Sequence, residues 1–92
     1  MISLTQKSWS EINKEVAVNV ANLRKRKKIS QAVLADKSGV SLGSIKRFEQ
    51  TGEISLQSLT KIAIALDSEK EIEGLFKDVP FASIQEIING QS

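Results

Sequence analysis

The sequence predicts an all-α fold of five helices with a short C-terminal helical extension. Apolar residues recur at spacings of three and four along each segment, which is the period of a helix that buries one face. A serine directly precedes most of these segments, where its hydroxyl is able to cap the first turn. The alternating pattern typical of strands is absent, apart from residues 2–4, which fit a short strand.

The first helix is predicted over residues 8–27, where Ser8 and Glu11 fit a capping box. One buried stripe is expected, made of Trp9, Ile12, Val16, Val20 and Leu23. The helix closes in the cationic run 24–28. These cations either complement the negative end of the helix dipole or contact phosphate.

Residues 30–52 predict two short helices joined by a tight turn. Ser30 is placed to cap a helix over 31–38, and Ser41 to cap a second helix over 42–50. The two helices are expected to cross at a steep angle, which is the arrangement of a helix-turn-helix unit.

The residues at this junction fit the crossing. Ala35 is small enough for the helices to approach closely, and Gly39 ends the first helix in the left-handed conformation that glycine adopts at little cost. Val40 and Ile45 are expected to fill the angle between the helices. In such units the second helix enters the major groove of DNA.

Two further helices are predicted after a stop at Thr51-Gly52. Ser55 is placed to cap a helix over 56–66 and Ser68 to cap one over 69–76. The expected buried stripe of the fourth helix is Leu56, Leu59, Ile62, Ala63 and Leu66, and the apolar residues of the fifth are Ile72, Leu75 and Phe76.

The domain is expected to span residues 1–78, and 79–92 to form the C-terminal extension. In the extension, Ser83 and Glu86 fit a capping box before an apolar stretch made of Ile84, Ile87 and Ile88. The extension either folds back on the domain, forms a homodimer contact or docks a protein partner. Trp9 poses the same choice at the other end.

Composition narrows the function classes. The 92 residues include no cysteine and no histidine, which removes the commonest metal ligands and the commonest general base. No metal, no cofactor and no enzymatic activity are therefore expected. Neither a signal peptide nor an apolar run of about 20 residues is present, so we expect a cytoplasmic protein without a membrane span.

Charge is distributed unevenly along the chain. Residues 1–66 hold eleven Lys and Arg against five Asp and Glu, and residues 67–92 hold two against six. A basic body favours polyanions because binding releases their counterions, although such a split is also common in small soluble proteins.

Three stretches carry a resemblance to a known family: Ile29-Ser-Gln-x-x-Leu-Ala-x-x-x-Gly-Val-Ser, Ile45-x-x-Phe-Glu49 and Ser55-Leu-x-x-Leu-x-Lys-Ile-Ala-x-Ala-Leu66. Together they resemble the xenobiotic-response-element (Cro/cI-like) helix-turn-helix regulators over residues 16–76. The resemblance implies a lambda-repressor-like DNA-binding domain. Within the family, residues 49–56 resemble HipB-like regulators and antitoxins.

The resemblance implies that the helix over 42–50 faces base edges with Leu42, Gly43, Ser44, Lys46 and Arg47. Leu42 and Gly43 depart from the family pattern because neither side chain hydrogen-bonds a base. Leu42 is still able to touch a thymine methyl, and Gly43 permits close backbone approach. Readout is therefore expected mainly from Lys46 and Arg47, with a phosphate contact or a solvated charge as the alternative for Arg47.

The resemblance also implies phosphate contacts by Gln31, Ser41, Thr51 and Ser55. Ordinary turn and cap chemistry is the alternative for Thr51 and Ser55. Arg24 and Glu49 match a pair that forms a largely buried salt bridge in phage repressors, so both are expected to be structural.

The expected function is sequence-specific binding of double-stranded DNA and transcriptional regulation. The expected form is a homodimeric repressor that reads a palindromic operator with the helix over 42–50. One alternative is an antitoxin that neutralises a toxin-type protein partner and regulates itself through DNA binding. The other is an adaptor that keeps the fold but binds no DNA.

Overall fold

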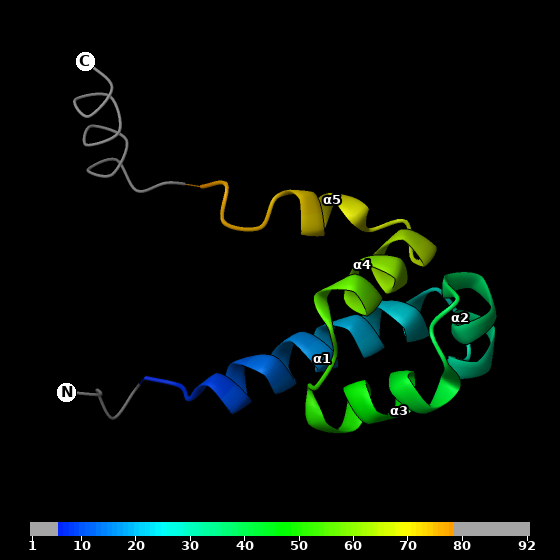
Figure 1. Ribbon diagram of the computed structural model, residues 1–92, viewed down its shortest axis with the longest axis horizontal. Helices are drawn as coiled ribbons and strands as arrows, with labels where there is room; N and C mark the ends of the chain where they lie inside the picture. The colour runs from blue at the N-terminus through cyan, green and yellow to red at the C-terminus, as the bar shows by residue number, and fades with distance from the viewer. Residues whose placement is uncertain (1–5, 79–92) are drawn as a thin grey trace, which may run out of the picture.

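The computed structural model describes residues 6–78, which form five helices joined by short loops (Figure 1). In chain order they are α1 (Trp9–Arg26), α2 (Gln31–Ser38), α3 (Leu42–Thr51), α4 (Leu56–Ala65) and α5 (Glu69–Glu73). The predicted all-α fold is confirmed, and each helix starts within one residue of its predicted start. The strand expected at 2–4 and the helix expected after Ser83 lie outside the described residues.

Serine side chains define where the first four helices begin. In each case the hydroxyl oxygen accepts a hydrogen bond from the backbone N–H three residues further on. This satisfies one of the backbone donors that a helix leaves free in its first turn. The capping serines are Ser8, Ser30, Ser41 and Ser55.

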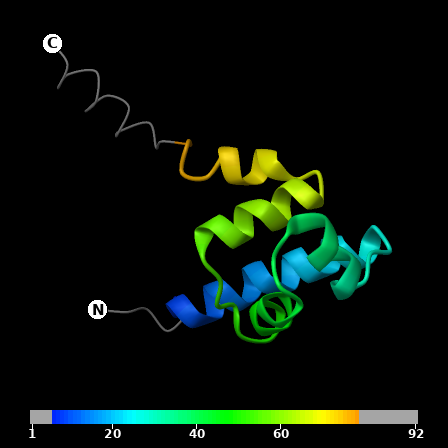
Figure 2. The same ribbon diagram turned by 45° about the vertical axis from the view of Figure 1, so that its right-hand side comes forward.

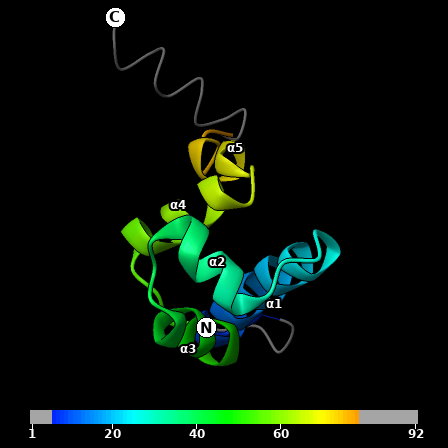
Figure 3. The ribbon, with the colours of Figure 1, turned by 90° about the vertical axis from the view of Figure 1, so that its right-hand side faces the viewer.

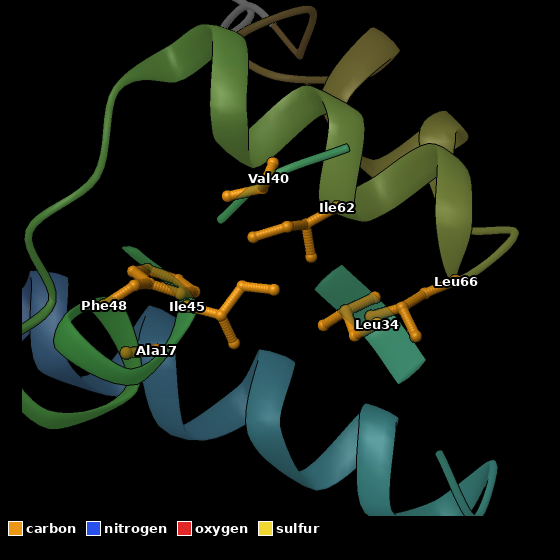
Figure 4. Close-up of a cluster of buried hydrophobic side chains, with 7 residues drawn as sticks. All are labelled: Ala17, Leu34, Val40, Ile45, Phe48, Ile62 and Leu66. Atoms are coloured by element: carbon orange, nitrogen blue, oxygen red, sulfur yellow. The ribbon is translucent and has the colours of Figure 1, made fainter. Parts of the chain in front are cut away.

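The first four helices enclose one core. The α1 helix packs against α3, and α2 contacts both α3 and α4, while α5 contacts α4 (Figure 2). The centre of the core consists of seven buried side chains (Figure 4), which are Ala17, Leu34, Val40, Ile45, Phe48, Ile62 and Leu66. No residue of α5 is fully buried, so this helix covers the domain from outside.

The buried face of α1 corrects the expected stripe. Its buried residues are Ala17, Ala21 and Arg24, whereas Trp9 and Ile12 are 76% and 48% exposed. The buried residues follow Val16, Val20 and Leu23 by one position each, so the buried face is rotated by about 100° from the predicted one. Alanine side chains are short, which lets α1 lie close to α3.

The apolar residues of the expected stripe on α1 differ in how far they are buried. Val20 and Leu23 are partly buried against the core, and with residues of α4 and α5 they line a surface cavity of about 380 Å³. Trp9, Ile12 and Val16 lie on the N-terminal half of α1 and are exposed. Helical spacing therefore identified the large apolar residues of α1 but not the face that the other helices bury.

The fourth and fifth helices need smaller corrections. Leu56, the first residue of α4, is 65% exposed, and the helix ends at Ala65 rather than at residue 66. The α5 helix ends at Glu73, so Leu75 and Phe76 lie beyond it and are 49% and 96% exposed. Ser68 does not cap α5, since its hydroxyl donates to the Leu66 carbonyl at 3.1 Å.

Candidate nucleic-acid interface

The turn between α2 and α3 has the predicted geometry. Gly39 adopts a φ of 74° and donates its N–H to the Ala35 carbonyl, which ends α2. Val40 follows and is buried, and Ile45 and Phe48 on α3 are 0% and 1% exposed. Because α3 is fixed to the core through these side chains, its opposite face points away from the protein.

The α3 helix lies along one edge of the domain, at the opposite end from α5 (Figures 1 and 3). All five residues expected to face base edges are exposed there. They are Leu42, Gly43, Ser44, Lys46 and Arg47. A methyl group built on Gly43 would meet no atom within 4 Å apart from its chain neighbours and the backbone of its own helix, so the start of this face is open.

Some hydroxyl groups of the site donate their proton within the protein, and others keep it available for DNA. The Ser41 hydroxyl donates to the Ser44 oxygen at 2.8 Å, which leaves the Ser44 proton for an external acceptor. The Thr51 hydroxyl donates to the Arg47 carbonyl at 2.7 Å, so its proton is already in use. Ser55 only accepts, from the Ser58 N–H, and keeps its proton.

Arg24 and Glu49 join α1 to the end of α3. Arg24 Nε and Nη2 donate to the two carboxylate oxygens of Glu49 at 2.8 and 3.0 Å, and Arg24 Nη1 donates to the Ile29 carbonyl at 2.8 Å. The two side chains are only 9% and 10% exposed. The Gln31 amide donates to the same carboxylate at 3.0 Å, so the half-buried Gln31 also holds α2 to α3.

The environment of the Glu49 carboxyl shifts its pKa. Burial by itself would raise the pKa, but the hydrogen bonds from Arg24 and Gln31, together with the charges of Arg24 and Lys25, outweigh it. The pKa of Glu49 is therefore lower than its ordinary value of about 4.5. The carboxylate stays ionised where it links the three helices.

The structure shows a partner of Arg47 that the sequence did not predict. Glu53, in the loop after α3, accepts from Arg47 Nε at 2.9 Å and lies 2.8 Å from Arg47 Nη2. The side chains are 69% and 60% exposed, so the pair is on the surface. Arg47 and Glu53 are six residues apart and separated by Gly52, a spacing that matches no helical pairing rule. The one signal in the sequence is that an acidic residue directly follows the helix-turn-helix unit.

Comparison with known families agrees with this geometry. The sequence model of a family described as Helix-turn-helix matches residues 20–72, more than half of the 92-residue chain. A comparison with curated proteins gives no match. Among the described helices, none combines the length and the apolar character that a membrane span requires.

Proposed function

The chain belongs to the Cro/cI-like helix-turn-helix family of sequence-specific DNA-binding transcriptional regulators, and we propose that it acts as a dimeric repressor. In this proposal α3 lies in the major groove of a palindromic operator. Each subunit reads one half-site, and the two half-sites are about one helical turn of DNA apart.

One observation carries the proposal, namely that α3 has two opposite faces. Ile45 and Phe48 are buried, whereas their neighbours Lys46 and Arg47 extend into solvent. Arginine is able to donate two hydrogen bonds to guanine, which provides roughly 1–3 kcal/mol of discrimination against another base. Arg47 is accordingly assigned to base readout and Lys46 to a base edge or a nearby phosphate.

Phosphate contacts are assigned to groups around α3. Ser55 retains a hydroxyl proton to donate to phosphate, and Ser44 retains one to donate to a base edge or a phosphate, whereas Ser41 and Thr51 use theirs within the protein. Gln31 stands at the first position of α2, where backbone N–H groups favour an anion. Its side-chain amide is engaged by Glu49, so the backbone N–H is the group we assign to phosphate.

The dimer is supported by apolar residues at the far end of the domain. Leu75 and Phe76 follow α5 and are 49% and 96% exposed, which is unfavourable for large apolar groups unless another surface covers them. A second copy of the chain is the proposed cover. Sedimentation measurements at micromolar concentration should show a dimer, and Phe76→Ser should shift the species towards a monomer.

DNA binding is tested by selecting duplexes from a random library and titrating the best sequence at low and moderate salt. Lys46→Ala and Arg47→Ala should each weaken binding at least tenfold, and affinity should fall steeply with salt. Lys70→Ala is the matched control, because Lys70 is an exposed cation on α5, away from α3. Equal effects of all three variants, or affinity that ignores salt, would exclude the proposed use of α3.

A second candidate function is that of an antitoxin, in which DNA binding serves autoregulation. Trp9, at 76% exposure, is the observation that favours it, because an exposed tryptophan suits the centre of a protein interface. Co-purification of one neighbouring gene product with the full chain, lost in Trp9→Ser while DNA binding persists, would support this function. Normal growth on expressing that gene product alone would count against it.

A further inference from the structure

We propose that Glu53 is a positioning residue for DNA recognition, which holds the Arg47 guanidinium in the orientation that reads guanine. This inference rests on the proposed function and adds to it a residue outside α3. Its basis is the arrangement of Arg47, Thr51, Gly52 and Glu53 at the end of that helix.

Glu53 occupies one edge of the Arg47 guanidinium and leaves its outer end open. One carboxylate oxygen of Glu53 accepts a hydrogen bond from Arg47 Nε at 2.9 Å and lies 2.8 Å from Arg47 Nη2. A guanidinium has five N–H donors in a rigid plane, so Nη1 and the second hydrogen of Nη2 stay available on its outer end. Those are the two donors that an end-on approach to guanine O6 and N7 requires.

The backbone of Glu53 is held in place by Thr51 and by the close approach of Gly52 to α1. The Thr51 hydroxyl donates to the Arg47 carbonyl at 2.7 Å and accepts from the Glu53 N–H at 3.1 Å. Between them, Gly52 adopts a φ of 83° and lies so close to Asn13 on α1 that an added methyl would stand 2.8 Å from the Asn13 carbonyl carbon. The backbone that carries Glu53 is therefore hydrogen-bonded to the end of α3 and packed closely against α1.

Glu53 places a negative charge beside the exposed face of α3. A carboxylate beside a groove-facing helix repels DNA phosphates and lowers non-specific affinity. Glu49, the acidic residue of α3 itself, is turned inward to Arg24, whereas Glu53 is 60% exposed beside Arg47. A carboxylate held in this place lowers the affinity for DNA of any sequence. It also orients the Arg47 side chain before binding, so that Arg47 loses less conformational entropy when it contacts a base.

The test uses the full chain and the duplex selected from the random library. Arg47→Ala first identifies the guanine whose preference depends on Arg47. Two dissociation constants are then measured for the wild type and for Glu53→Gln, one for the selected duplex and one for the same duplex with that guanine replaced by adenine. The second constant divided by the first is the discrimination ratio. Glu69→Gln is the control, since it removes one exposed negative charge on α5, away from α3.

We expect Glu53→Gln to lower the discrimination ratio about three- to tenfold, while affinity for an unrelated duplex stays equal or rises. Glu69→Gln should leave the ratio unchanged, and Glu53→Gln should not alter the guanine preference when Arg47 is already alanine. Thermal unfolding of each variant verifies that the fold is retained.

The inference is overturned if Glu53→Gln leaves the ratio unchanged or raises it, because Glu53 then merely competes with DNA for Arg47. It is also overturned if the Arg47→Ala variant keeps every base preference of the wild type. Failure of the proposed function looks different, since the wild type would then enrich no sequence from the library.

Discussion

Two Arg–Glu pairs, each with one member on α3, have opposite environments. Arg24–Glu49 lies between α1 and α3 with both side chains about nine-tenths buried, and Arg47–Glu53 lies on the outer side of α3 with both more than half exposed. The distances between their charged atoms are nearly the same. The buried pair also has more hydrogen bonds, since Arg24 donates to both carboxylate oxygens of Glu49, whereas Arg47 meets a single oxygen of Glu53. Burial and bonding together therefore predict that the first pair contributes far more to stability than the second.

The physical reason is the cost of removing one partner. A charge left alone in a buried site cannot regain its hydration, whereas an exposed charge is solvated at once. The same contrast applies to the two faces of α3 as a whole. Substitutions on the inner face should change stability, and substitutions on the outer face should change DNA binding.

The largest effect is expected from Arg24→Ala, which leaves the Glu49 carboxylate without its main partner. We expect a loss of about 3–5 kcal/mol in the free energy of unfolding, measured by urea denaturation. Arg47→Ala removes the exposed partner of Glu53 and should change stability by at most about 1 kcal/mol. Similar losses in the two variants would contradict the distinction between the pairs.

Gly52→Ala should have the next largest effect. It combines a positive φ with a new methyl group 2.8 Å from a backbone carbon of Asn13, which cannot rotate away. The backbone strain by itself costs about 1–3 kcal/mol. Gly39→Ala is the matched control, since Gly39 also has a positive φ but open space around it. A melting temperature that falls equally in both would show that the approach to α1 is unimportant.

A smaller effect is expected from pH. Because the pKa of Glu49 is lower in the folded state, its stabilisation is complete above about pH 4.5 and is lost as pH falls through the folded-state pKa. The midpoint of urea unfolding should therefore decrease in acid. In Glu49→Gln this part of the acid dependence should vanish, and an unchanged acid slope in that variant would show that Glu49 is not responsible.

The smallest effect, and one of opposite sign, is expected from Gly43→Ala on the outer face. Position 43 is helical and open, so alanine should stabilise the protein by about 0.5–1 kcal/mol. If Gly43 permits close backbone approach to DNA, the same variant should bind the selected duplex less tightly. A gain in stability together with unchanged affinity would remove Gly43 from the interface.

Much of the fold was predictable because its signals are local. Each serine cap acts on a backbone group three residues away, and Gly39 terminates α2 through its own φ. The helix starts and the turn geometry therefore agree with the structure. The exposure of Lys46 and Arg47 followed from the burial expected for Ile45 and Phe48, although which exposed residues contact DNA stays a prediction.

The sequence by itself determined where the helices begin, how α2 meets α3 and which family the chain resembles, because adjacent residues carry those signals. Tertiary structure decided the rest. It selected Ala17 and Ala21 over Trp9 and Ile12 as the buried face of α1, and it placed Glu53 beside Arg47. Both outcomes depend on which surfaces meet after folding, and spacing along a single helix contains no information about a surface that arrives from elsewhere in the chain.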